Sequence, residues 1–72
     1  MEDLVRYIAC SLVDEPERVE TVCRDERIEL KVAEPDLGKV IGRQGRTIKA
    51  MRVLLSAAAA RQGQNLTLDV VE

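Results

Sequence analysis

The stretch that decides the fold is residues 37–48, which read Leu37-Gly38-Lys39-Val40-Ile41-Gly42-Arg43-Gln44-Gly45-Arg46-Thr47-Ile48. Asp36 precedes it and is well placed to cap a short helix over residues 37–41. Gly42 should end that helix, because glycine accepts the left-handed backbone that is common just past a helix end. A longer helix is predicted to begin near Gly45 and to run to about Arg61. The stretch therefore predicts two helices joined by a tight glycine loop.

The spacing of the glycines narrows the kind of phosphate contact that this loop can make. A Walker loop needs G-x-x-x-x-G-K-[ST], which is absent, and the glycines do not have the spacing of the dinucleotide fingerprint G-x-G-x-x-G. What remains is Gly42-Arg43-Gln44-Gly45. Two glycines allow a turn through which a sugar-phosphate backbone can approach the main chain. The next helix directs its free N–H groups and positive dipole end at that turn, and Arg43 and Arg46 add charge.

Hydrophobic periodicity extends the prediction to the rest of the chain. Apolar residues at helical spacing predict a helix over residues 2–13, and Pro16 should break the chain after it. Strands are predicted over residues 18–24, 27–33 and 65–71, with the first two forming a hairpin and Pro35 ending the second. The order is α-β-β-α-α-β. A right-handed crossover makes the second and third strands parallel, which predicts an α+β fold: a three-stranded mixed sheet with three helices packed on one face.

The charge is strongly uneven along the chain. The formal net charge is −2, and residues 1–36 carry 11 acids against 5 bases. Residues 37–61 carry no acid and six bases: Lys39, Arg43, Arg46, Lys49, Arg52 and Arg61. A phosphate responds to the local field rather than to the total charge, so the helix–loop–helix segment is the predicted contact for an anionic partner.

Composition excludes several classes of protein. The chain has no histidine and two cysteines, Cys10 and Cys23, with no CxxC pair. Two soft ligands are too few for structural zinc. Two reduced, largely buried thiols in a cytosolic protein are the expectation, and a Cys10–Cys23 disulfide or a redox role is the alternative. No activated cysteine or acidic pair suggests catalysis, so an enzyme, a cofactor and a small-molecule substrate are not expected. The acidic N-terminus and the short apolar runs predict no signal peptide and no membrane contact, hence a cytoplasmic protein. With one aromatic residue, stacking platforms of the RRM or OB type are disfavoured.

Together, the run from Val40 to Ile48 and the element order resemble a KH domain of the bacterial, type II form. The resemblance covers nearly the whole chain, so residues 1–72 are expected to form a single domain. It is closest to the small single-domain KhpA family, of which the run Asp36–Gly42 and the later run Leu54–Ala60 are both typical. KH domains clamp about four nucleotides of single strand on their G-x-x-G loop.

The resemblance implies a function and a set of site residues. It implies an RNA-binding protein of low sequence specificity, acting as an RNA chaperone or post-transcriptional regulator linked to cell elongation and envelope growth. The implied partners are single-stranded RNA and, through self-association or pairing, a second copy or the larger KH protein KhpB. The implied RNA-binding residues, with Ile41 and Ile48 near the floor of an apolar groove, are Lys39, Ile41, Gly42, Arg43, Gln44, Gly45, Arg46, Thr47, Ile48 and Lys49.

Three alternatives stay open on the sequence alone. The loop could be a plain helix–loop–helix turn without a ligand, and single-stranded DNA could replace RNA. The chain could also act mainly as a protein-interaction module, because a 72-residue core is thin. For that module, the apolar segment Ala57–Ala60 suggests dimerisation through a helix, with Ala58 and Ala59 as the residues to test.

Overall fold

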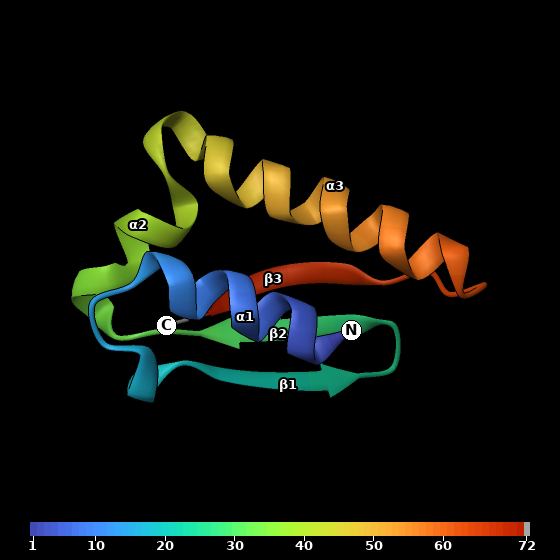
Figure 1. Cartoon of the computed structure of the whole chain (residues 1–72), viewed down its shortest axis with the longest axis horizontal. Coiled ribbons are helices and arrows are strands. Elements are labelled where there is room, and N and C mark those ends of the chain that lie inside the picture. The colour runs from blue at the N-terminus through green and yellow to red at the C-terminus, as the bar shows by residue number, and fades with distance from the viewer. Residues whose placement is uncertain (72) are drawn as a thin grey trace.

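The computed structural model describes residues 1–71 and contains three α-helices and three strands (Figure 1). In chain order the elements are α1 (Glu2–Leu12), β1 (Glu20–Arg24), β2 (Arg27–Lys31), α2 (Leu37–Ile41), α3 (Arg46–Arg61) and β3 (Thr67–Val71). Three single turns of 3-10 helix connect them, at Pro16–Arg18, Glu34–Asp36 and Arg43–Gly45. The predicted order α-β-β-α-α-β is confirmed.

The sheet is mixed, in the order β1-β2-β3. β1 pairs with β2 antiparallel, as the hairpin prediction requires, and Cys23 lies opposite Ile28. Cys23 is exposed and Cys10 is half-buried, so the expectation of two largely buried thiols was wrong. β2 pairs with β3 parallel, with Ile28 opposite Leu68. The parallel pairing follows from the α2–α3 crossover, because a parallel neighbour can be reached only by a connection that returns the chain to the same end of the sheet.

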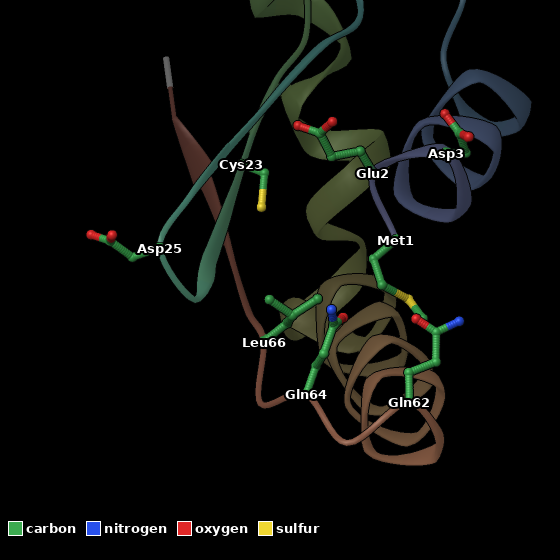
Figure 2. Close-up of a pocket in the computed structure, with 8 residues that line it drawn as sticks. All are labelled: Met1, Glu2, Asp3, Cys23, Asp25, Gln62, Gln64 and Leu66. Carbon is green, nitrogen blue, oxygen red and sulfur yellow. The ribbon is translucent and has the colours of Figure 1, made fainter.

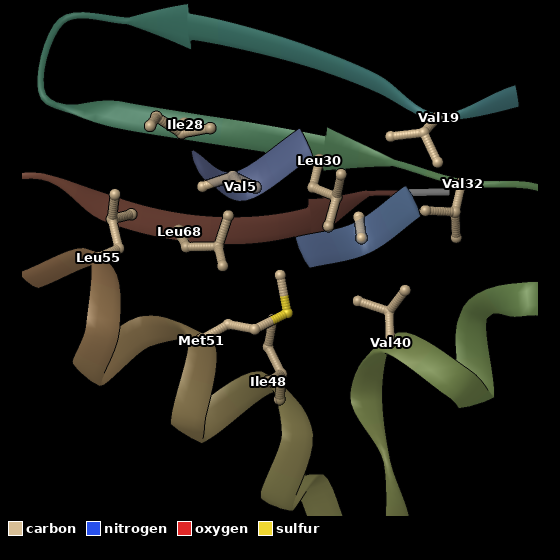
Figure 3. Packing of buried hydrophobic residues seen from close by; sticks show 11 residues of the cluster. Val5, Val19, Ile28, Leu30, Val32, Val40, Ile48, Met51, Leu55 and Leu68 are labelled. Atoms are coloured by element: carbon tan, nitrogen blue, oxygen red, sulfur yellow. The ribbon is translucent and has the colours of Figure 1, made fainter. Parts of the chain in front are cut away.

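The core lies on one face of this sheet. Alternation in β2 turns Ile28 and Leu30 inward, and both are fully buried. Leu68 of β3 joins them, and buried side chains from all three helices cover these strand residues (Figure 3). The covering side chains are Val5 and Ala9 from α1, Val40 from α2, and Ile48, Met51, Leu55 and Ala59 from α3. The opposite face carries the charged residues of β2. The predicted packing of three helices on one face is thus confirmed.

Several predicted boundaries were too generous by one or two residues. α1 ends at Leu12, because Val13 already has an extended backbone. β2 ends at Lys31, so it is not Pro35 that stops it; Pro35 belongs to the following 3-10 turn. Strand ends are set by where pairing partners stop, which periodicity alone does not give.

The predicted capping role of Asp36 was wrong in its chemistry. Asp36 occupies the N-cap position of α2, but its side chain makes no capping hydrogen bond there. Its two carboxylate oxygens instead accept hydrogen bonds from the main-chain N–H groups of Asp14 and Glu15, at 3.3 and 3.1 Å. Asp36 is buried, and it fastens the segment after α1 to the start of α2. A contact across more than twenty residues overrides the local preference for a cap.

Candidate nucleic-acid interface

The loop between α2 and α3 has a backbone that depends on its glycines. Gly42 has φ 77° and ψ 172°, a combination open essentially to glycine alone, and Gly45 has φ 74° and ψ 16°, in the left-handed region. Gln44 between them also has a positive φ of 58°. The loop is closed by main-chain hydrogen bonds from Gly42 N–H to Gly38 O (2.8 Å) and from Gly45 N–H to Gly42 O (3.1 Å). The result is a fixed, sharply turned main chain, which stands out at one end of the molecule in Figure 1.

Gly42 is also needed for space. A Cβ at this position would lie 2.7 Å from Thr47 Cβ and 2.9 Å from Thr47 N. Main chain therefore packs directly against the first turn of α3. At Gly45 the nearest atom to such a Cβ is Ile48 Cγ2, at an ordinary 4.0 Å. The two glycines thus have different roles: Gly42 permits a close approach, whereas Gly45 supplies only the left-handed turn.

The first turn of α3 begins at this loop and has no side-chain cap, although the N–H of Arg46 donates to Arg43 O within the 3-10 turn. The N-cap is Gly45, no side-chain hydrogen bond caps the helix, and the turn holds no acidic residue. A 16-residue helix brings the positive end of its dipole to this point. Arg43, Gln44 and Arg46 are exposed around it, and Lys49 is exposed one turn later. A helix N-terminus without a side-chain cap and with cations around it suits a phosphate.

Lys39 lies close to the loop in sequence but is engaged elsewhere. Its ammonium group donates to a carboxylate oxygen of Asp14 and lies 3.6 Å from Asp36 Oδ1. The hydrogen bond with Asp14 is the largest cause that raises the pKa of Lys39 above its ordinary value of 10.5. Lys39 thus ties α2 to the segment after α1. The structure groups it with these acids, apart from the exposed cations of the loop.

The two isoleucines expected near the groove floor have different surroundings. Ile48 is only 7% exposed and belongs to the core cluster. Ile41, the last residue of α2, is 39% exposed. Ile41 therefore offers an apolar surface next to Gly42, while Ile48 mainly anchors the start of α3.

A cleft runs beside α3, between this helix and the edge strand β3. It has a volume of about 320 Å³ and is lined by Arg52, Ser56, Asn65, Leu66, Thr67, Leu68 and Asp69. Within it, Arg52 Nε donates a hydrogen bond to the main-chain carbonyl of Leu68, at 3.0 Å. Arg52 follows the loop by seven residues of helix, roughly 10 Å of rise. The sequence marks Arg52 only as one of the six bases of residues 37–61. Its place in the cleft depends on β3 lying beside α3.

A second cavity, of about 350 Å³, lies at the other end of α3 (Figure 2). Its lining includes three carboxylates, from Glu2, Asp3 and Asp25, and no lysine or arginine side chain. Met1, Gln62 and Leu66 surround it in Figure 2. A phosphate would meet like charges there, so this cavity does not suit nucleic acid.

The family model for the KH domain of KhpA and KhpB matches residues 2–70, nearly the whole chain. The chain belongs to the KhpA/KhpB KH-domain family. This family consists of RNA-binding proteins and not of enzymes, so the chain is not an enzyme, as its residues predicted. The type II resemblance and the α+β fold are both confirmed.

Proteins named RNA-binding protein KhpA are similar over their full length. The one from Halalkalibacterium halodurans is 45% identical over 76 residues, which cover all of both chains. The one from Clostridium perfringens is 45% identical over 75 residues, covering 99% of this chain and 100% of the relative. The one from Chlamydia caviae is 46% identical over 76 residues, covering 100% of this chain and 97% of the relative. No solved structure matches the chain significantly.

Two further findings concern the residues of this KhpA/KhpB-type domain that the structure describes. No helix within residues 1–71 is long and apolar enough to cross a membrane. Over the same residues, no cluster of three or more His, Cys, Asp or Glu side chains is placed to hold a metal ion.

The exposed apolar surface of α3 differs from the one that the sequence suggested. Ala59 is fully buried in the core, so a substitution there would test folding and not association. The large apolar side chains open to solvent on this helix are Val53 (68% exposed) and Leu54 (55% exposed), flanked by the exposed Ala50 and Ala57. Spacings of three and four residues place these four on one side of the helix.

Proposed function

We propose that residues 1–72 form one KH domain that binds single-stranded RNA, clamping its backbone on the loop Gly42–Gly45. The observation that carries this proposal is the first turn of α3, which has no side-chain cap and meets a tight glycine loop with exposed arginines on both sides. No acid lies within residues 37–61 to repel a phosphate. The names of the full-length relatives point to the same ligand.

Each residue of the site has a proposed role. Gly42 and Gly45 shape the loop, and Gln44 and Thr47 offer main-chain and side-chain donors to the RNA backbone. Arg43, Arg46 and Lys49 neutralise phosphates, Ile41 packs against a base, and Ile48 holds the start of α3. Lys39 acts indirectly, because its ion pairs with Asp14 and Asp36 fix α2 below the loop.

The cellular role that fits such a site is a general one. Contacts to backbone rather than to base edges give affinity without much sequence information. This fits a cytoplasmic RNA chaperone or post-transcriptional regulator, linked through the family resemblance to cell elongation and envelope growth. No cofactor, metal or small-molecule substrate is part of the proposal.

The test is a titration of labelled single-stranded RNA with wild type and with the double variant Arg43→Asp, Gln44→Asp. The chain offers a matched control: Arg61→Asp, Gln62→Asp makes the same two replacements and the same change of charge at the other end of α3. Both pairs are exposed. The loop variant should lose binding while its circular dichroism spectrum stays unchanged, and the control should bind within a few-fold of wild type.

Two outcomes would overturn the loop as the RNA site. One is equal weakening by the two double variants, which would mean that total charge alone drives binding. The other is an absence of RNA binding by folded wild-type protein at high concentration. Single-stranded DNA of the same sequence, titrated alongside, tells whether the site accepts deoxyribose.

A second function, association through α3, is favoured by the exposure of Val53 and Leu54. We propose that this apolar stripe pairs with the same stripe of a second copy, because a helix with open valine and leucine gains free energy by covering them. Two linked loops would bind one RNA with greater avidity. The family model covers KhpB as well as KhpA, and pairing with the KH domain of KhpB is the related form of this proposal.

Molar mass in solution tests association. Wild type should form a dimer, and Leu54→Glu should be a monomer that keeps its fold and its RNA-contacting loop. Gln44→Glu, which makes the same change of charge at an exposed position in the loop before α3, serves as the control and should leave the mass unchanged. A wild-type monomer at all concentrations would rule out self-association, and mixing with KhpB would then test the other partner.

A further inference from the structure

The cleft between α3 and β3 contains an arginine whose direction is fixed by the fold. Arg52 Nε donates to Leu68 O at 3.0 Å in a partly buried setting. One of its five N–H donors is thereby used, and the guanidinium plane is tied to the edge strand β3. Arg52 forms no ion pair within residues 1–71, and it remains exposed. Its two terminal amino groups are therefore free to donate to a ligand in the cleft.

The cleft can hold more than an ion. Its volume of about 320 Å³ falls at the lower end of the range for small-molecule sites. Its lining mixes apolar surface from Leu66 and Leu68 with polar groups: the hydroxyls of Ser56 and Thr67, the amide of Asn65, and the carboxylate of Asp69, which is paired with Arg27 at 3.5 Å. A flat, partly apolar group with hydrogen-bonding atoms on its edge fits such walls, and a nucleobase is such a group. The roughly 10 Å of helix between loop and cleft lets a base reach it from a backbone held on the loop.

Hydrogen-bonding chemistry then decides which base is preferred. An arginine fork presents two parallel donors and matches two adjacent acceptors, as in N7 and O6 of guanine. Adenine has an amino group in place of O6, so a donor would face a donor. The same contact therefore favours guanine and disfavours adenine.

We propose that Arg52 is a specificity-determining residue that reads the N7/O6 edge of a guanine in the α3–β3 cleft. The proposal rests on the proposed RNA-binding function and adds one base preference to a site that otherwise contacts backbone. The proposed role of Arg52 depends on the geometry of its side chain and not on its charge alone. A lysine at this position would keep the positive charge but would present no planar fork.

The experiment uses RNAs of four uridines, about the length that a KH loop holds, in which one guanosine or one adenosine replaces each uridine in turn. Their affinities are measured for wild type, Arg52→Lys and the control Arg61→Lys, which makes the same replacement outside the cleft. At one position of the RNA, wild type and control should bind guanosine about 5-fold or more tighter than adenosine, the lower end for a bidentate contact. Arg52→Lys should bring that ratio close to one and leave the affinity for the adenosine RNA nearly unchanged.

A nuclear magnetic resonance signal gives a second readout. The Arg52 Nε–H resonance should shift on addition of the guanosine RNA and much less with the adenosine RNA. The proposal is overturned if wild type shows no preference at any position, or if Arg52→Lys retains the preference. If wild type binds none of these RNAs, nor a longer single strand, the RNA-binding function itself fails; binding without preference removes only the role of Arg52.

Discussion

Replacing Gly42 by alanine should destabilise the protein far more than the same replacement at the neighbouring glycines. Two costs combine at Gly42. Its φ of 77° with ψ of 172° lies where side chains are strained by about 1–3 kcal/mol. The added methyl would also lie 2.7 Å from Thr47 Cβ and 2.9 Å from Thr47 N. The second contact is with main chain, which cannot move aside without shifting the first turn of α3.

The segment itself provides the comparison. At Gly45 an alanine would meet only the left-handed strain, because its nearest neighbour is 4.0 Å away; we expect a loss of about 1–2 kcal/mol. At Gly38, within α2 and with open space around it, alanine should be neutral or stabilise by up to about 1 kcal/mol. For Gly42→Ala we expect a loss of about 3 kcal/mol or more. A domain of this size has roughly 3–5 kcal/mol in total, so Gly42→Ala should be partly unfolded in buffer.

Urea unfolding followed by far-ultraviolet circular dichroism measures the series. The urea midpoint should be highest for Gly38→Ala, lower for Gly45→Ala and lowest for Gly42→Ala. The slopes of the unfolding free energy against urea should be similar if only stability changes. Equal losses at Gly42 and Gly45 would show that the approach of Thr47 has no energetic weight. A stable Gly42→Ala protein would refute the backbone argument for this loop altogether.

Three further results are expected. Affinity for single-stranded RNA should fall with salt at a log–log slope of about −2 to −3, as for three or four neutralised phosphates; a slope near zero in a salt titration would contradict a phosphate clamp. Because the folded-state pKa of Lys39 is raised above 10.5, its stabilising contribution is complete below that pH and is lost as the pH rises through the raised pKa. The gap in urea midpoint between wild type and Lys39→Met should therefore be present at neutral pH and close in strong alkali, and a gap independent of pH would contradict the ion pair. Asp36→Asn should lower the free energy of unfolding by about 1–3 kcal/mol, since one of two buried acceptors becomes a donor facing an N–H group; no loss in a urea titration would mean that these hydrogen bonds contribute little.

The fold was largely predictable because its signals are local. Alternation in β2 and the stripe through Met51 and Leu55 gave the strands and helices their inward faces, and the glycines marked the loop. The topology followed from the element order and the right-handed crossover, and the KH resemblance agrees with it. The candidate site was predictable only in part: Arg43 and Arg46 lie around the loop as expected, whereas Lys39 is held by acids from a distant segment. Spacing along a helix cannot reveal such a partner.

The sequence by itself determined the element order, the position of the tight turn and the concentration of positive charge after residue 36, because these depend on residues close in the chain. Only the tertiary structure decided that Asp36 binds the segment after α1 and not its own helix. The same holds for Arg52, which meets Leu68 in a cleft because β3 lies beside α3. It holds also for α3, where Val53 and Leu54 stay open while Ala59 is covered. The physical reason is common to all three: a side chain's hydrogen bonds and its contact with water depend on what packs beside it, and in this small fold those neighbours come from distant parts of the chain.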